Sequence, residues 1–413
     1  MQQRFVSNEH RGTRAMPSRL RSLDLFSGIG GMTLALLPVA KPVAYCEIDA
    51  SAVAVLRDNM RNGRLPRAPI ATDVREVTAA ALPGKVDIVL AGFPCTGFSN
   101  SGLRRGFSDP GSRLFYEVLR IYDDLASAQP AQPPMLFLEN VPSVMSMGRK
   151  AIARELSVKR GLEVRWAIVG ASDVGAPHRR RRWFCLAVPK ASVGRRIPVQ
   201  RDRERFDWSR EPVARTSRCA DSRPRHGLLG NAVVPEAAWS AFAYLANAFR
   251  DPATDPVRRI SRLEATPEES RLAGFVRAGD AAWSPAAAFP RRRCSVRGIT
   301  LVPDAYRSRG PPKSTHRAGS IKAEPVHLTH WATPTRTDAW RISAQHLTDR
   351  SAGQLHTQVR FEARTRDREQ PVSAEFVEYL MGFPRGWTVG GRSPPTTPRS
   401  RQKNGVDKAD NTE

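Results

Sequence analysis

The sequence has 413 residues, of which 40% are hydrophobic, and 65 Lys and Arg against 40 Asp and Glu give it a formal net charge of +25. This length suffices for a large core domain and a smaller second one. No apolar run approaches the roughly 20 residues that span a bilayer, and residues 1–20 lack the apolar stretch of a signal peptide. These features argue against membrane and secreted proteins and predict a soluble, cytoplasmic one.

The positive charge is spread over both halves of the chain, and 56 of the 65 cationic residues are Arg. A basic surface suits a polyanionic partner such as nucleic acid, and the alternative is an ordinary solvated surface in an Arg-rich protein. The five cysteines include no Cys-x-x-Cys pair, so neither a disulfide framework nor a zinc site is predicted. One of them is a candidate catalytic thiol, and they are Cys46, Cys95, Cys185, Cys219 and Cys294.

Short apolar runs alternate with helix-like stretches over residues 22–190, which is typical of βαβ units around a parallel sheet. We therefore predict an α/β fold with a parallel sheet. The predicted strands are Ser22–Phe26, Pro42–Glu47, Pro69–Asp73, Val86–Ala91, Met135–Glu139, Glu163–Gly170 and Trp183–Ala187. Helices are predicted to start after Gly31, at Ser51, at Ser112 and near Gly148.

After about residue 190 the periodicity is lost in an Arg-rich stretch, which indicates a linker or surface loop. A helix is predicted next, with Pro235 near its first turn and an apolar stripe on one face. Residues 251–325 are typical of loops, while 373–383 predict a helix capped by Ser373, and a polar tail ends the chain.

The first predicted strand runs into a glycine-rich turn in LDLFSGIGGMTLAL, with Gly28, Gly30 and Gly31. Glycines at the carboxyl edge of a sheet let the backbone approach a ligand, and the alternative is a tight turn without one. Glu47 ends the second strand, where an acid can accept both hydroxyls of a ribose. Asp73 ends the third, where a carboxylate can accept an amino proton of adenine. Taken alone, either acid is an ordinary surface or capping residue.

The fourth strand leads into GFPCTGFS and places Cys95 at the edge where open α/β sheets hold their chemistry. A thiolate is a strong nucleophile near neutral pH, whereas most cysteines are small buried hydrophobes. Pro94 before this cysteine and the Gly, Ser and Asn after it indicate a loop and favour the nucleophile. The fifth strand ends in FLENVPS, so Glu139 and Asn140 lie at the same edge, where a carboxyl beside a thiol suits acid–base work.

A run of four arginines in VGAPHRRRRWFCLA precedes the last predicted strand. On an extended chain Arg180 and Arg182 face one side and Arg179 and Arg181 the other, so one pair can face the site. The alternative is a solvated charge run in an Arg-rich chain.

Together these segments resemble the DNA (cytosine carbon-5) methyltransferase family over residues 22–190, in order and in spacing. DLFSGIGG is similar to the S-adenosylmethionine loop of the family, and PCTGFSNSGLRRGFSDPGSRLF resembles its nucleophile segment and mobile loop. ENV and PHRRRRWF resemble the two blocks that follow. The resemblance implies a Rossmann-like, doubly wound methyltransferase fold with a smaller, loop-rich C-terminal target-recognition region.

It also implies a mechanism, in which a cytosine is flipped out of the duplex and Cys95 adds to carbon-6. Glu139 hydrogen-bonds the ring, carbon-5 takes the methyl group, and Arg180 and Arg182 hold the base and favour the thiolate. Thr96–Gly111 is the implied lid. The S-adenosylmethionine residues implied are Phe26, Ser27, Gly28, Gly30, Gly31, Glu47, Ile48, Asp73, Val74, Pro94, Asn231 and Ala232. No metal is implied.

The sequence departs from the family in its late blocks. Thr96 and His178 stand where many members have Gln. LLGNAVVPEAAWSAFAYLA resembles the last family motif but precedes FVEYLMGFPRGW, which resembles the motif that normally comes before it. Either the enzyme is rearranged and works, or the C-terminal half of the gene is damaged or duplicated. We expect the former, because HWATPTRTDAW and GQLHTQVRFEA resemble segments that precede the later block in phage-type relatives.

The predicted division of the chain has a catalytic domain, a linker, a completing helix, a target-recognition region and a tail. Their bounds are 20–190, 191–225, 226–250, 251–390 and 391–413. The predicted function is DNA cytosine-5 methylation in a restriction–modification system or a phage, and the alternatives are an inactive DNA-binding relative and a tRNA cytosine-5 methyltransferase. Double-stranded DNA is the predicted partner of a monomeric enzyme, and a cognate restriction endonuclease is a second candidate partner.

Overall fold

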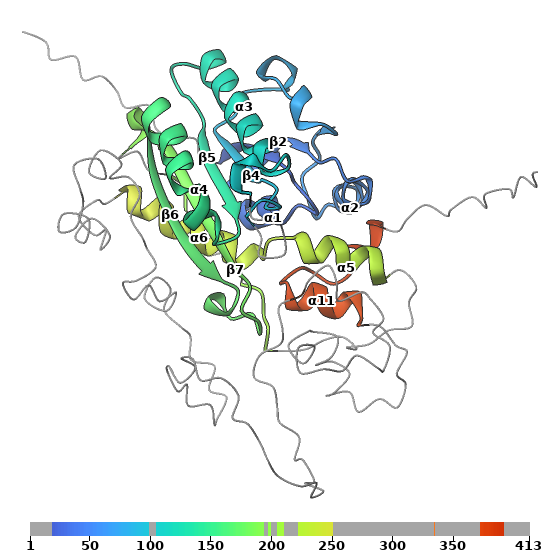
Figure 1. Cartoon of the computed structure of the whole chain (residues 1–413). Helices are drawn as coiled ribbons and strands as arrows, with labels where there is room; N and C mark the ends of the chain where they lie inside the picture. The colour runs from blue at the N-terminus through green and yellow to red at the C-terminus, as the bar shows by residue number, and fades with distance from the viewer. Residues whose placement is uncertain are drawn as a thin grey trace, which may run out of the picture.

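The computed structural model describes residues 19–98, 105–193, 197–199, 205–209, 222–250, 334 and 372–391. Its strands form one seven-stranded sheet in the order β3-β2-β1-β4-β5-β7-β6, with helices on both faces (Figure 1). The strands are β1 (Leu20–Leu25), β2 (Ala40–Cys46), β3 (Ile70–Ala71), β4 (Ile88–Gly92), β5 (Met135–Asn140), β6 (Leu162–Gly170) and β7 (Arg181–Pro189). The α-helices are α1 (Gly31–Leu36), α2 (Ala50–Arg61), α3 (Phe115–Ala128), α4 (Val144–Ala153), α5 (Ser222–Asn231), α6 (Pro235–Arg250) and α11 (Ala374–Leu380).

All seven predicted strands are present, which confirms the α/β reading, but the prediction of a parallel sheet is wrong at one edge. Strands β1 to β5 pair in parallel, whereas β7 is antiparallel both to β5 and to β6. Residues 171–180, which join β6 to β7, contain only the short 3-10 turn Ser172–Val174. A parallel neighbour needs a crossover of a dozen or more residues, so this connection closes a hairpin instead.

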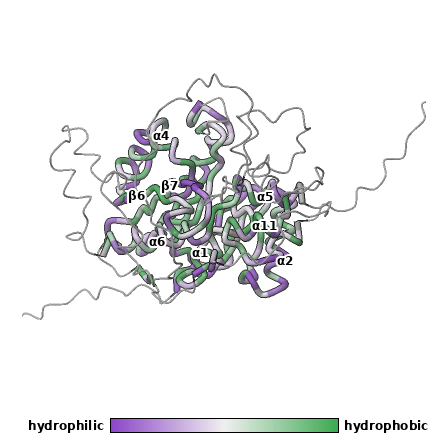
Figure 2. Tube along the Cα trace, turned by 90° about the horizontal axis from the view of Figure 1, so that it is seen from below, coloured by the Kyte–Doolittle hydropathy of each residue, from purple (hydrophilic) through white to green (hydrophobic). Residues whose placement is uncertain are grey.

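Two hydrophobic clusters, one on each face of the sheet, hold the helices in place. Helices α3 and α4 cover one face through residues such as Phe115 and Ile152. Helices α1, α2 and α6 cover the other, where the predicted stripe of α6 is buried. In Figure 2 hydrophobic residues lie mainly in the centre of the molecule, and hydrophilic ones mark outer segments such as α2. The predicted helix at 233–249 is thereby confirmed and completes the second face.

The late segment 372–391 packs into the cluster on the α6 face. Phe376, Phe383 and Trp387 are fully buried there, together with residues of α1 and α6 (Figure 1). Ser373 occupies the N-cap position of α11, as predicted, but makes no capping hydrogen bond, since its hydroxyl donates to Glu375 (2.9 Å). The proposed target-recognition region 251–390 thus ends in a segment that is part of the catalytic fold, and 251–371, apart from Pro334, lies outside the described residues.

A buried ion-pair network ties this segment to α5. The Arg225 guanidinium donates to Glu375 (2.6 Å), to Glu378 (2.9 Å) and to the hydroxyl of Thr388 (2.8 Å). The Arg225 and Glu378 side chains are only 3% and 0% exposed, so each charge depends on the other for compensation.

Replacing Arg225 by methionine is expected to lower the free energy of unfolding by about 3 kcal/mol, because Glu378 is left buried without its counter-charge. Urea denaturation measures the loss. Arg61 is the control, because its pair with Asp58 has an arginine side chain that is 70% exposed. Arg61→Met should leave the midpoint unchanged. Equal midpoints for all three proteins would show that the network contributes nothing to stability.

Within the described part of the chain, no helix is long and apolar enough to cross a membrane.

Candidate functional site

The glycine-rich turn after β1 opens toward the carboxyl edge of the sheet. Phe26, Gly28 and Gly30 all have positive φ angles, of 54°, 53° and 85°, so the chain turns sharply between β1 and α1. A Cβ atom added at Gly28 would have no neighbour within 4 Å, whereas one at Gly31 would lie 2.8 Å from a Val233 methyl group. The turn therefore has space on its outer side and is packed tightly on its inner side.

Glu47 lies directly beside this turn. Its carboxylate accepts hydrogen bonds from the backbone N–H groups of Gly28 (2.6 Å) and Asp49 (2.8 Å). Burial raises the pKa of Glu47 above its ordinary value, and these backbone donors oppose the rise. The next side chain, Ile48, is 75% exposed although it is a large hydrophobe. A half-buried acid beside an exposed apolar side chain and an open glycine turn suits a ligand with a ribose and a flat apolar ring.

Asp73 follows the next strand along the same edge and is engaged locally. It caps the short 3-10 helix Val74–Glu76 and pairs in a fork with Arg75 (2.6 Å). These hydrogen bonds lower the pKa of Asp73 to about 2, so the group is a carboxylate at neutral pH. The neighbouring Val74 is buried. Asp73 can therefore accept a hydrogen bond from a ligand once the Arg75 side chain turns away.

Cys95 lies in a tight turn after β4, where the Phe98 N–H donates to the Cys95 carbonyl (2.8 Å). Pro94 precedes it, and the Phe93 carbonyl accepts a hydrogen bond from the side chain of Asn140 (3.0 Å). Burial and the charge of Glu139 raise the pKa of the Cys95 thiol, while Arg182 and Arg180 lower it by a smaller amount. The two arginines thus act in the predicted direction, but the thiol of the free protein is protonated at neutral pH.

Glu139 and Arg182 form an ion pair across the neighbouring strands β5 and β7, with Arg182 Nε 3.0 Å from Glu139 Oε1. Both side chains are largely buried, with 14% of Glu139 and 19% of Arg182 exposed. Burial raises the pKa of Glu139, and the arginines only partly offset it. The site therefore holds a carboxyl group with a raised pKa within electrostatic reach of the Cys95 thiol.

Arg180 points to the loop between α5 and α6. Its terminal nitrogens donate to the carbonyls of Gly230 (2.9 Å), Ala232 (2.7 Å) and Pro334 (3.2 Å). Its Nε is buried with no partner among the described residues. Arg180 thus links the strand that carries Arg182 to the loop of Asn231 and Ala232, in addition to its electrostatic effect on Cys95.

His178 connects the same strand to the late segment. Its ring is fully buried, and Nε2 lies 2.9 Å from the Leu380 carbonyl while Nδ1 accepts the backbone N–H of Arg180. Nε2 is therefore the protonated nitrogen. Burial and Arg180 lower the pKa of His178 to about 3, so the ring is neutral. His178 has a structural hydrogen-bonding role here and does not face the thiol.

The segment after Cys95 is held to residues 107–112 by polar and aromatic contacts. The Thr96 hydroxyl hydrogen-bonds Asp109, and the Gly97 N–H donates to the hydroxyl of Ser112 (2.9 Å). Phe98 stacks edge-on against Phe107 with ring centroids 4.9 Å apart. Residues 99–104 of the predicted lid lie outside the described residues.

Sequence reasoning missed the residues that support the glycine-rich turn from behind. Val233 and Phe383 fill the space next to Gly31, and the Trp387 indole N–H donates to the Ile29 carbonyl (2.8 Å). Trp387 belongs to the FVEYLMGFPRGW block. This block resembles a family motif, but the sequence alone predicted no role for it in binding S-adenosylmethionine. Among the described residues, no group of His, Cys, Asp and Glu is arranged to hold a metal ion.

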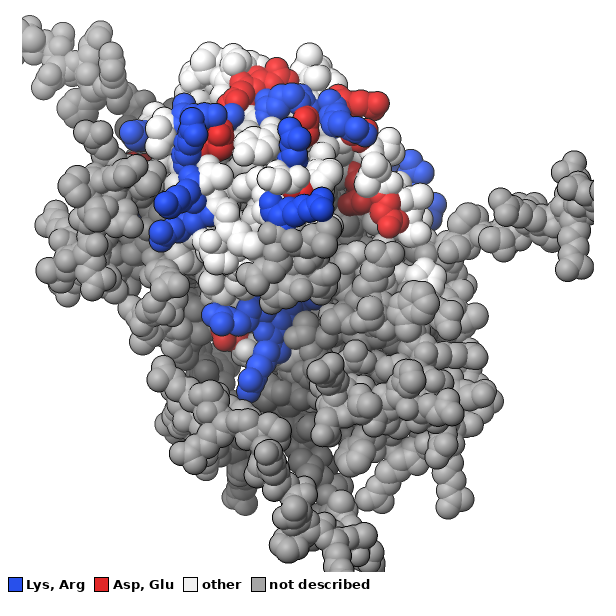
Figure 3. All heavy atoms as spheres, viewed as in Figure 1, with Lys and Arg blue, Asp and Glu red and all other residues white. Residues whose placement is uncertain are grey.

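Charge is mixed on the described surface. On the face shown in Figure 3, Lys and Arg side chains stand among Asp and Glu over α3 and α4, and a second basic group lies lower on the same face.

Residues 20–221 match the family model described as C-5 cytosine-specific DNA methylase. The chain is 28% identical to the Type II methyltransferase M.CviJI of Paramecium bursaria Chlorella virus IL3A, over 88% of this chain and 96% of that protein. It is 36% identical to M.HpaII of Haemophilus parainfluenzae over 41% of this chain and 46% of that protein. It is 32% identical to M.DsaV of Dactylococcopsis salina, again over 41% of this chain and 45% of that protein. The chain thus spans nearly all of M.CviJI but less than half of the other two.

Among solved structures, a mutant of DNMT2 from Spodoptera frugiperda matches 41% of this chain and 50% of its own, with a TM-score of 0.33 and 23% identity.

Proposed function

We propose that the chain, of which residues 20–221 match the C-5 cytosine-specific DNA methylases, methylates cytosine in double-stranded DNA through a covalent adduct to Cys95. The observation that carries this proposal is the arrangement of Cys95 beside the Glu139–Arg182 ion pair, at the same sheet edge as the open glycine turn and Glu47. S-adenosylmethionine, when bound, supplies a methyl group activated by its sulfonium charge. The turn around Gly28, with Glu47 and Ile48, would hold it.

Each residue at the site has a role in the proposed reaction. Cys95, after losing its proton, forms a bond from Sγ to carbon-6 of a cytosine flipped out of the duplex. Glu139, whose pKa is raised by burial, would take up a proton and donate it to the ring nitrogen, so that electron density rises at carbon-5. Carbon-5 would then accept the methyl group. Its proton would leave to solvent, and the electrons of that C–H bond would re-form the carbon-5–carbon-6 double bond and expel Cys95 as the thiolate. Arg182 orients Glu139 and stabilises negative charge near the thiol.

The reversed order of the two late sequence motifs in the chain is compatible with a working enzyme. Segment 372–391 packs next to α5 and α6, so two blocks that are reversed in the chain lie side by side in the fold. The likeness to M.CviJI covers 366 residues and so extends well beyond residue 221. We infer a rearranged, active enzyme of a restriction–modification system or a phage, acting as a monomer, with a cognate endonuclease as a further partner in the first case.

The direct test is transfer of labelled methyl from S-adenosylmethionine to unmethylated DNA, with the modified bases mapped by sequencing. Label at carbon-5 of cytosine in one short sequence context is expected. Label on tRNA in place of DNA would redirect the function to RNA. A folded, cofactor-binding protein that labels neither would be an inactive relative.

The rate is expected to depend on pH because the thiol is protonated in the free enzyme. Burial and Glu139 raise the pKa of Cys95, so kcat/KM should increase about tenfold per pH unit between about pH 7 and 9. A stopped assay at DNA concentrations well below KM, which reports kcat/KM, measures the slope over this range. A flat profile would show that the thiolate is already formed when DNA binds.

Target selection is assigned to residues 251–371, which lie between α6 and the α11 segment. Replacing them by a short flexible linker, while keeping 372–391, should preserve S-adenosylmethionine binding and abolish methylation at one preferred sequence. Mapping of the residual methylation checks this. Unchanged sequence selectivity would exclude the region as the target reader.

A further inference from the structure

The carbonyl of Ile29 in the cofactor turn is held by a residue far along the chain. It accepts a 2.8 Å hydrogen bond from the indole N–H of Trp387, and the Trp387 side chain is fully buried. Ile29 lies between Gly28 and Gly30, which both have positive φ angles and which, as glycines, can adopt more backbone conformations than other residues. A fixed donor here limits the conformations of the turn.

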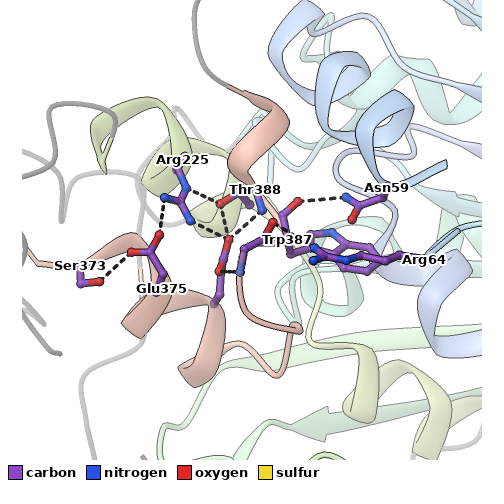
Figure 4. Close-up of polar contacts among 9 residues, drawn as sticks. Asn59, Arg64, Arg225, Ser373, Glu375, Trp387 and Thr388 are labelled. Atoms are coloured by element: carbon purple, nitrogen blue, oxygen red, sulfur yellow. Dashed lines mark hydrogen bonds and ion pairs between the residues drawn. The ribbon is translucent and has the colours of Figure 1, made fainter. Parts of the chain in front are cut away.

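Trp387 is at the same time bound to helix α2, which follows the strand that ends at Glu47. The side chain of Asn59 donates to the Trp387 carbonyl (2.9 Å), and Arg64 donates to the neighbouring carbonyl of Gly386 (3.1 Å; Figure 4). Asn59 is fully buried, so its hydrogen bond is shielded from water. Trp387 therefore contacts the glycine turn through its side chain and α2 through its backbone carbonyl.

The backbone around Trp387 is itself fixed by Glu378 of α11. This carboxylate accepts from the Gly386 N–H (2.6 Å), the Thr388 N–H (2.7 Å) and the Thr388 hydroxyl (2.6 Å). Figure 4 shows the Arg225 guanidinium reaching into the same network from α5. The contacts run without interruption from α5 through α11 to Trp387 and then to the cofactor turn.

We propose that Trp387 is a positioning residue for the cofactor: its indole N–H holds the Ile29 carbonyl and so sets the affinity of the glycine turn for S-adenosylmethionine. This inference rests on the proposed function, because it assumes that the turn binds that molecule. The proposal makes the affinity for S-adenosylmethionine depend on segment 372–391. In the sequence, this segment follows the region to which target selection is assigned. The reversed block order therefore leaves the cofactor site complete.

The test is Trp387→Phe in the full chain, which keeps an aromatic ring beside Phe383 and removes the N–H. Loss of one hydrogen bond should weaken S-adenosylmethionine binding roughly 3- to 10-fold in isothermal titration calorimetry. The KM for S-adenosylmethionine should rise by the same factor, while kcat at saturating cofactor stays near the wild-type value. A general loss of folded protein would lower kcat and leave KM unchanged.

Trp208→Phe is the matched control, because its indole N–H donates over nearly the same distance (2.9 Å) to the Tyr379 carbonyl of α11. That bond does not touch the cofactor turn, so the control should bind S-adenosylmethionine as the wild type does. Equal affinity of Trp387→Phe and wild type, or equal weakening by both variants, would overturn the inference. A folded wild-type chain that binds no S-adenosylmethionine would overturn the proposed function itself.

If Trp387→Phe does not fold, hydrogen exchange on the wild type decides the matter. S-adenosylmethionine should slow exchange at the amides of Gly386, Trp387 and Thr388, which are coupled to the turn through the indole. Protection confined to the turn and to Glu47 would contradict the coupling.

Discussion

Replacing Cys95 by serine is expected to lower the rate of methyl transfer to below about a thousandth of the wild-type value, with DNA and S-adenosylmethionine binding intact. A serine hydroxyl is far less acidic than a thiol, and the burial that already raises the pKa of Cys95 would raise that of a hydroxyl further. The measurement is single-turnover transfer of labelled methyl, alongside binding titrations for both ligands.

Cys185→Ala is the control for removal of a thiol. Cys185 is fully buried in β7, and burial raises the pKa of its thiol, so this group takes no part in chemistry. The activity per folded molecule should match the wild type. Duplex DNA with 5-fluorocytosine at the target adds a second readout, since carbon-5 then has no proton to lose and the adduct should persist on denaturing gels. An adduct formed equally by Cys95→Ser would refute the assigned nucleophile.

Replacing Glu139 by glutamine is expected to lower kcat about a thousandfold, because an amide cannot supply the proton that the ring nitrogen takes up as Cys95 adds. The carboxyl is largely buried beside Arg182, and this burial raises its pKa, which favours uptake of a proton compared with an exposed glutamate. Glu139 does not contact the glycine turn or Glu47, so the affinity for S-adenosylmethionine should not change. Rates at saturating DNA and cofactor separate the chemical step from binding.

Glu163→Gln is the matched control for this charge removal. Glu163 also faces an arginine in the sheet, but its carboxylate lies 3.9 Å from Arg165 and is 34% exposed. Its replacement should leave kcat unchanged. A wild-type rate for Glu139→Gln would mean that the proton comes from another group, and the acid assignment would then be wrong.

Local signals in the sequence were sufficient for most of the catalytic fold. Apolar runs and glycine or proline breaks located the strands, because a strand buried on both faces is read directly as a short apolar run. The stripe that predicted α6 is buried against the sheet. Glu47 lies beside Gly28, as expected for residues that follow neighbouring parallel strands and so meet at one edge, while its role toward a ribose stays a prediction.

The antiparallel β6–β7 hairpin was not predicted, because its apolar runs look the same in either strand direction. Whether two strands pair in parallel or antiparallel is decided by the length of the segment that connects them and by the strand available for pairing at the edge of the sheet. The same hairpin brings Arg182 next to Glu139, so the geometry of the proposed acid depends on a pairing between distant segments.

By itself, the sequence determined the α/β class, the edge that carries the site and the residue types gathered there, because these follow from local periodicity and from motif spacing. Only the tertiary structure decided how those residues are used. Arg180 donates to the carbonyls of the α5–α6 loop, His178 is neutral and bonded to α11, and Trp387 supports the cofactor turn. The physical reason is that each of these contacts joins residues more than 50 positions apart, so it depends on packing and burial, which no local pattern encodes.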